Sequence, residues 1–103
     1  MELRRFTRAP LERPLEFQTK NLDRRCRGLA KDISVGGMFV QADEPAPFGA
    51  EVIIHITLPS EPRELRLPGV VRWTRPNGMG LQFGLLGVRE THAITEIVKQ
   101  TET

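Results

Sequence analysis

The chain has 103 residues, of which 39% are hydrophobic and 27% are charged, a composition typical of one globular domain with a single core. No apolar run approaches the roughly 18 residues that a membrane helix needs. The basic N-terminus also lacks the apolar block of a signal peptide, so we expect a cytoplasmic protein without membrane insertion. The single cysteine excludes an internal disulfide, and the two histidines lie far apart without ligand partners, so no metal site is expected.

The net charge of +2 is unevenly distributed along the chain. Residues 1–31 hold nine Lys or Arg and four Asp or Glu, whereas residues 32–103 hold six and nine. Twelve of the fifteen basic residues are arginine, the side chain suited to planar, bidentate recognition of phosphates and base edges. A solubilising basic end would explain this pattern, and so would a site for an anionic ligand.

Residues 1–13 have neither helical nor strand periodicity, and we predict that they form an extended, flexible N-terminal arm. Residues 14–103 are predicted to form the single folded domain. Apolar and polar residues alternate there with the period of a β-strand in six segments, which are 15–19, 26–34, 38–41, 50–59, 64–74 and the sequence GMGLQF. From about 88 to 100 the apolar period becomes helical. This order predicts a mainly β fold, a six-stranded antiparallel barrel followed by a C-terminal α-helix.

The alternation also assigns faces within two of these strands. Leu29 and Ile33 should share one face of the second strand, and Trp73, which alternates with Val71, should lie in the core, although an exposed indole could stack on a base. Arg72 and Arg75 would extend a basic surface or simply face water. Pro68 and the glycine after it predict a bulge or bend, because proline cannot donate to a sheet ladder.

The sequence DISVGGMFV interrupts the apolar pattern with an acid, a hydroxyl and two adjacent glycines. Asp32 and Ser34 are two residues apart, so their side chains share one face of a regular strand. Asp and Ser before paired glycines are common in plain hairpins, where they cap backbone groups. The same residues would suit a turn that holds a ligand, and both interpretations stay open at this point.

Three stretches, taken in order, make the chain resemble a known family. The sequence RRFTR carries Arg4 and Arg8 in an RxxxR spacing, and DISVGGMFV carries Asp32, Ser34 and Gly37 in a DxSxxG spacing. With LRLPGVVRWTRPNGMGLQF after them, they resemble the PilZ domain, whose members that bind cyclic di-GMP carry both signatures. The resemblance implies a six-stranded barrel with a C-terminal helix. It also implies an N-terminal arm that folds over the ligand.

If the ligand is cyclic di-GMP, its two phosphates and two guanines suit an arginine-rich arm. A guanidinium can bond two phosphate oxygens or the O6 and N7 atoms of guanine, and it can stack on a purine. Arg4 and Arg8 are the motif arginines, and Arg5 supplies the additional arginine that the family usually carries in this run. We expect all three to bind the ligand.

The turn would supply the remaining contacts in such a site. Asp32 would accept hydrogen bonds from the N1 and N2 donors of guanine, and Ser34 would donate to a phosphate or a base edge. Gly36 and Gly37 would take positive φ and let the backbone approach the ligand without a Cβ in the way.

These expectations describe a stand-alone receptor that binds cyclic di-GMP and needs no other cofactor. By ordering its arm, it would relay the signal to a protein partner in motility, exopolysaccharide or related machinery. One alternative is a PilZ-like adaptor in pilus or motility control that works without the nucleotide. Another is a small barrel that binds single-stranded nucleic acid, which the six aromatic residues, most of them in core positions, argue against. The sequence offers no nucleophile–base pair, no P-loop and no set of metal ligands, so we do not expect an enzyme.

Overall fold

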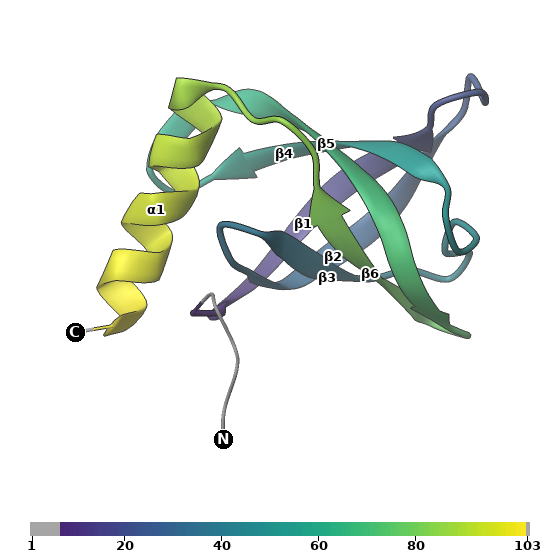
Figure 1. The fold of residues 1–103 in the computed structure, drawn as a ribbon, viewed down its shortest axis with the longest axis horizontal. Coiled ribbons are helices and arrows are strands. Elements are labelled where there is room, and N and C mark those ends of the chain that lie inside the picture. Colours follow the sequence, from purple (N-terminus) through teal and green to yellow (C-terminus); the bar gives the residue numbers. More distant parts are fainter. Residues whose placement is uncertain (1–6, 103) are drawn as a thin grey trace.

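The computed structural model describes residues 7–102 and shows a closed six-stranded antiparallel barrel followed by one helix (Figure 1). Around the barrel the strands follow the order β1-β2-β3-β6-β5-β4. The elements are β1 (Ala9–Thr19), β2 (Arg25–Ile33), β3 (Gly37–Gln41), β4 (Glu51–Leu58), β5 (Glu61–Arg75), β6 (Gly78–Phe83) and α1 (Val88–Glu102). The predicted fold class is confirmed.

Strand β1 begins earlier than the sequence predicts. Ala9 pairs with Ile33 and is fully buried, so residues 9–13 belong to the barrel wall and not to an arm. The alternation fails in this stretch because the β1–β2 register shifts between Pro10 and Arg13, where Glu12 takes a φ of 50°. The mobility predicted for the start of the arm concerns residues 1–6, which lie outside the described residues.

The barrel interior is filled by alternate residues of the strands. On β4, the core side chains are Val52, Ile54, Ile56 and Leu58, each at most 2% exposed. Burying a side chain of this kind contributes about 1.5–3 kcal/mol relative to leaving it in water. Because the sheet closes on itself and its interior is filled by side chains, any ligand must bind on its outer wall or at its ends.

Two register shifts change which side chains face outward. Between β5 and β6, Val71 pairs with Leu81 and Trp73 pairs with Gly80, so Arg72 is an extra residue on β5. Since Leu81 points into the core, its neighbour Gly80 faces outward, and so does Trp73 opposite it. The core position predicted for Trp73 is therefore wrong.

The second shift lies in β2. Ala30 pairs with Val40 and Asp32 pairs with Phe39, which leaves Lys31 as the extra residue. Ala30 and Ile33 are consequently both fully buried, whereas Leu29 is only half-buried. The prediction that Leu29 and Ile33 share a face is wrong for this reason, and the bulge turns Asp32 toward the outside of the barrel.

Of the bulge or bend predicted at Pro68, the bulge does not occur. Pro68 pairs with Ile53 and Gly69 pairs with Val52 in continuous register. The Pro68 carbonyl accepts a hydrogen bond from the Gly84 N–H at 2.9 Å, so the proline nitrogen faces the same side, where β6 has already ended. The missing donor therefore removes no bond from the β4–β5 ladder.

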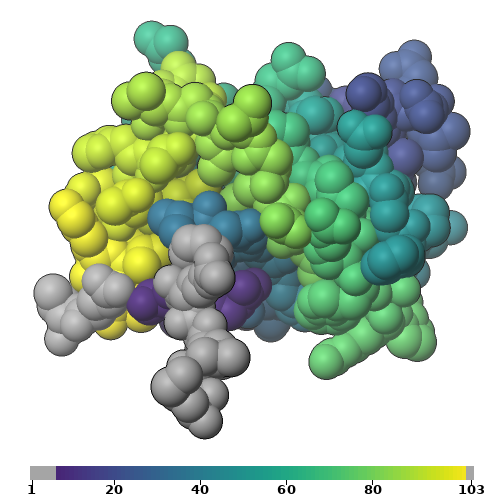
Figure 2. Space-filling model, in the orientation of Figure 1, coloured from purple at the N-terminus to yellow at the C-terminus, as the bar shows by residue number. Residues whose placement is uncertain are grey.

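Helix α1 packs across one end of the barrel, against β5 and β1. Its buried face consists of Ala93, Ile94 and Ile97, and the Ser60 hydroxyl donates a hydrogen bond to the Ala93 carbonyl at 3.2 Å. Figure 2 shows the yellow helix against the blue atoms of the β2–β3 hairpin and the green connection that follows β6. Among residues 7–102 there is no helix with the length and apolar character needed to span a membrane.

Candidate ligand-binding site

The β2–β3 hairpin is held closed by the side chain of Ser34. Its hydroxyl accepts hydrogen bonds from the N–H groups of Gly36 and Gly37, both at 3.2 Å, and donates to the Gly37 carbonyl at 3.3 Å. One donor and two lone pairs are the full capacity of a hydroxyl, and Ser34 is only 1% exposed. Ser34 therefore organises the turn, and its hydroxyl has no bond left to offer a ligand in this conformation.

The turn glycines act through close approach and not through positive φ. Among the described residues, only Glu12 and Gly49 have positive φ, so this expectation for Gly36 and Gly37 is wrong. A Cβ on Gly37 would lie 2.0 Å from the Leu81 carbonyl oxygen, because β6 runs directly against it. The Gly36 carbonyl accepts a hydrogen bond from the Phe83 N–H at 2.9 Å, which ties the turn to β6.

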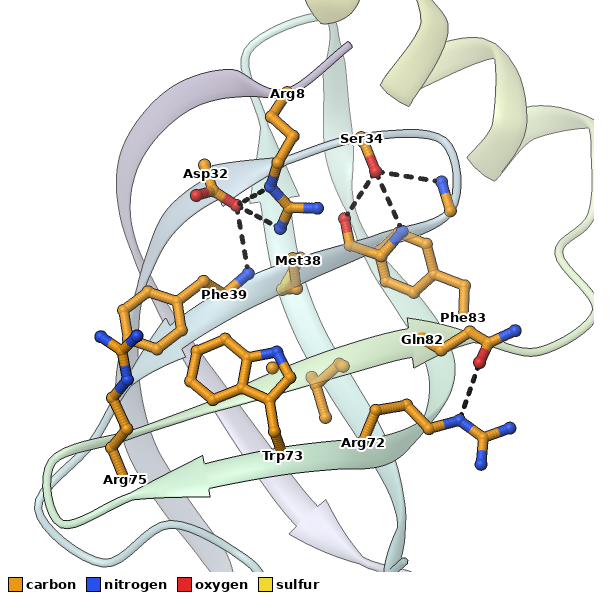
Figure 3. Close-up of a pocket in the computed structure, with 14 residues that line it drawn as sticks. Arg8, Asp32, Ser34, Met38, Phe39, Arg72, Trp73, Arg75, Gln82 and Phe83 are labelled. Atoms are coloured by element: carbon orange, nitrogen blue, oxygen red, sulfur yellow. Dashed lines mark hydrogen bonds and ion pairs between the residues drawn. The ribbon is translucent and has the colours of Figure 1, made fainter. Parts of the chain in front are cut away.

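Arg8 and Asp32, one residue from each predicted motif, contact one another on the outer face of the barrel (Figure 3). The Arg8 Nη2 and Nε atoms both donate to Asp32 Oδ1, at 2.6 and 3.1 Å. The same oxygen accepts a hydrogen bond from the Phe39 N–H at 3.3 Å. Both side chains remain about one-third exposed, 38% for Arg8 and 32% for Asp32, so a ligand can reach them.

An aromatic platform, formed by Phe39 and Trp73, lies beside this pair. The two rings are stacked with centroids 5.2 Å apart and planes 12° apart, and the Arg75 guanidinium carbon lies 4.9 Å from the indole centroid. The indole covers Gly80, where a Cβ would lie 2.1 Å from the indole Nε1. Trp73 nevertheless stays 42% exposed, which leaves ring surface for a planar ligand.

These groups surround a cleft of about 810 Å³, within the ~300–1,000 Å³ range of small-molecule sites. Arg8, Arg72 and Arg75 line it together with the single carboxylate of Asp32, so the cleft is positively charged and favours an anionic ligand. Arg72 donates through Nε to Gln82 Oε1 at 2.7 Å, which fixes its guanidinium at the rim.

Most of the predicted site residues are brought together by the fold. The cleft is lined by Arg8, Asp32, Ser34, Gly36 and Gly37, whereas Arg4 and Arg5 lie outside the described residues.

Two residues that line the cleft could not be recognised from the sequence. Phe39 and Gln82 read as ordinary strand residues, and only the pairing with the bulged strands reveals that they face the cleft. For Trp73, the nearby arginines Arg72 and Arg75 are the sequence feature that could have indicated an outward position.

The comparisons with known proteins agree with this architecture. The family model of the PilZ domain matches residues 2–100, and the chain therefore belongs to the PilZ family. PilZ domains are ligand-binding receptor domains rather than enzymes. A comparison with curated protein sequences finds no match.

Solved structures with this fold share little sequence with the chain. The PilZ domain of CeSA from a cellulose-synthesizing bacterium is 21% identical with a TM-score of 0.73, covering 93% of this chain and 98% of that one. The PilZ domain of YcgR from Escherichia coli, solved with c-di-GMP, is 20% identical with a TM-score of 0.70, covering 98% and 92%. The Bacillus subtilis inhibitor of motility MotI/DgrA is 20% identical with a TM-score of 0.77; the match covers 99% of this chain but only 52% of MotI.

Proposed function

We propose that this PilZ domain is a receptor that binds cyclic di-GMP in the cleft beside the β2–β3 hairpin. The observation that carries the proposal is the meeting of Arg8 and Asp32, 2.6 Å apart, at a cleft that also contains an exposed indole. Membership of the family and the c-di-GMP complex of the YcgR domain add support.

The chemistry of the cleft suits each part of a cyclic dinucleotide. The Arg8 guanidinium has donors for phosphate oxygens or for the O6 and N7 acceptors of guanine. Asp32 Oδ2 makes no hydrogen bond with the described residues and can accept from the guanine N–H donors. Trp73 offers a face on which a purine can stack, with Arg75 beside it as a cation.

The ligand would also engage the residues that precede β1. We propose that Arg4 and Arg5 bind the nucleotide together with Arg8 and that the N-terminal arm becomes ordered over it. This change would alter the surface that the domain presents to a partner protein, and the signal would be relayed by contact and not by catalysis.

Isothermal titration of cyclic di-GMP into the wild type, Arg8→Ala and Asp32→Ala tests the proposal, with GTP as the ligand control. Arg63→Ala is the matched protein control, because Arg63 is an exposed arginine of β5 outside the cleft. Saturable heat is expected for the wild type and for Arg63→Ala. Loss of a charge-assisted contact at Arg8 or Asp32 should weaken binding by about ten-fold or more.

The absence of saturable heat for the wild type, with far-UV circular dichroism showing a folded barrel, would overturn the receptor function. The domain would then be a nucleotide-independent adaptor. Binding that responds equally to GTP and falls steeply with salt would indicate a general polyanion site instead.

A further inference from the structure

Arg72 and Trp73 are consecutive residues of β5, yet both are exposed and both line the cleft. In a regular strand, neighbouring side chains point to opposite faces, so an outward Trp73 would direct Arg72 into the apolar core. The register shift between Val71 and Trp73 removes this conflict, because it makes Arg72 an extra residue that can face outward as well. The bulge therefore adds a guanidinium to the cleft next to the indole.

Gln82 holds this guanidinium in place without neutralising it. The Arg72 Nε atom donates to Gln82 Oε1 at 2.7 Å, and the amide carries no charge. The Nη hydrogens of Arg72 and the amide hydrogens of Gln82 make no hydrogen bond with residues 7–102, and no carboxylate in this part of the chain forms an ion pair with Arg72. The Arg72–Gln82 pair is therefore a fixed positive charge with free N–H donors.

The Arg8–Asp32 pair differs from it in charge and in hydrogen bonding. Its opposite charges lie 2.6 Å apart and neutralise one another, and it combines free donors of Arg8 with the free acceptor Asp32 Oδ2. Figure 3 shows the two pairs on different sides of the Trp73 indole. The third arginine of the cleft, Arg75, lies over this ring, 4.9 Å from its centroid, and no hydrogen bond to a described residue fixes it there. Among the described arginines of the cleft, Arg72 alone is both fixed by a hydrogen bond and not neutralised.

The two polar parts of cyclic di-GMP match this division. A phosphodiester is anionic and offers acceptors only, which suits a fixed cation with free donors. A guanine is neutral and carries both donors and acceptors, which suits a neutral pair that has both. We infer that Arg72, positioned by Gln82, binds a phosphate of cyclic di-GMP, while the Arg8–Asp32 pair contacts a guanine. This inference rests on the proposed function and deepens it, because it gives the nucleotide an orientation in the cleft.

Isothermal titration of cyclic di-GMP into two arginine variants of β5 tests the contact. Arg72→Ala should weaken binding by about ten-fold, the loss expected for one charge-assisted contact. Arg72→Lys keeps the charge but loses the fork that Gln82 orients, so its affinity should lie between those of the wild type and Arg72→Ala. Arg63→Ala, which removes an exposed arginine of the same strand outside the cleft, should bind as the wild type does.

A phosphorothioate analogue of cyclic di-GMP, with sulfur in place of one non-bridging oxygen of each phosphate, shows which part of the ligand Arg72 contacts. Sulfur accepts hydrogen bonds less well than oxygen, so the wild type should bind at least one diastereomer more weakly than cyclic di-GMP. Arg72→Ala should discriminate less between the two ligands, and so should Gln82→Met, which lacks the oxygen that holds Arg72. Asp32→Ala, which loses a guanine contact, should discriminate as the wild type does.

Two results would overturn the phosphate contact. One is a wild-type affinity of Arg72→Ala for cyclic di-GMP. The other is a weakened Arg72→Ala that still discriminates against the phosphorothioate as strongly as the wild type, because Arg72 would then contact a base. In both cases the wild type binds and the proposed function stands. A folded wild type that does not bind cyclic di-GMP would overturn the proposed function and this inference together.

Discussion

At the scale of single residues, Trp73 shows how one side chain can serve a ligand at little cost to the fold. Its indole lies over Gly80 and beside Phe39, but close to half of its surface stays in contact with water. An aromatic ring held flat and exposed in this way loses little conformational freedom when a base stacks on it. Trp73 therefore lies outside the core, and we propose that its ring serves ligand binding.

Replacing this indole should weaken nucleotide binding and leave the barrel intact. For Trp73→Ala we expect a loss of about 1–3 kcal/mol in binding free energy, the usual value of one base–aromatic stack. Isothermal titration measures the loss, and in the wild type the quenching of Trp73, the only tryptophan, reports the same event. Phe48→Ala removes an exposed aromatic outside the cleft and should bind normally. Equal affinities for both variants would exclude the stacking role.

His55 makes the stability of the domain depend on pH. Burial lowers the pKa of His55 below its ordinary value of 6.5, and Arg25 and Arg66 lower it further, while Glu64 and Glu16 act in the opposite direction. The unfolded chain therefore binds a proton near pH 6.5, whereas the folded chain binds it only at lower pH. The free energy of unfolding should be highest above pH 6.5 and should fall as the pH drops below it.

Urea unfolding of the wild type and of His55→Gln, from about pH 7.5 to about pH 5, checks this expectation. Carboxylates titrate in both proteins, so the difference between the two curves isolates the histidine. Stability of the wild type should decline more steeply across this range, and parallel curves would contradict the role given to His55.

At the scale of elements, the contact between the β2–β3 hairpin and β6 shapes the cleft. Gly37 lets β6 lie against the turn, and the Ser34 hydroxyl holds the turn in a conformation that this contact requires. Asp32 and Phe39 precede and follow the turn on paired positions, so their placement depends on it. The DxSxxG spacing thus describes one ligand-facing residue and two residues that shape the turn.

Gly37→Ala should therefore damage both stability and binding. The new Cβ would meet the Leu81 backbone and not a flexible side chain, and overpacking of this kind costs about 1–3 kcal/mol or more. Gly84→Ala is the matched control, because its Cβ would have its nearest neighbours at 3.9 Å. Thermal unfolding of the two variants should separate them clearly. A Gly37→Ala protein as stable as Gly84→Ala would show that β6 can move away without cost.

The sequence predicts the six strands and the helix because period-two and helical patterns depend only on neighbouring residues. It predicts Arg8 and Asp32 as site residues through the motif spacing. It does not predict the outward position of Trp73 or the buried hydroxyl of Ser34. Both depend on pairing with β3 and β6, distant in the sequence, and a bulge at Arg72 has no local signature.

At the scale of the whole molecule, the barrel wall forms the cleft and the helix contributes to the core. The outer wall carries the cleft that we propose for the nucleotide, while α1 covers the end of the barrel. The helix contributes Ala93, Ile94 and Ile97 to the same core that the strands enclose. Its docking should therefore influence stability without any direct contact with the ligand.

Ile94→Ala tests this division. The side chain is fully buried, and truncation of a buried isoleucine costs about 2–5 kcal/mol. Val88→Ala, on the same helix but 88% exposed, should stay within about 0.5 kcal/mol of the wild type. Urea denaturation measures the free energy of unfolding of both variants. Titration of Ile94→Ala, under conditions where this variant is folded, should give the wild-type affinity for cyclic di-GMP. A weakened affinity there would mean that helix docking is coupled to the cleft.

The extra residue at Arg72 has a further consequence for how the family can vary. Because Trp73 pairs with Gly80 and Val71 with Leu81, deleting Arg72 would join two correctly paired positions and leave the indole facing outward in a regular ladder. Chains that lack a residue at this point can therefore keep the indole at the same place beside the cleft, although they lose the guanidinium that Arg72 places at the rim. Related domains are best aligned here by their strand pairing, since a gap of one residue between Val71 and Trp73 removes a rim residue without moving the indole.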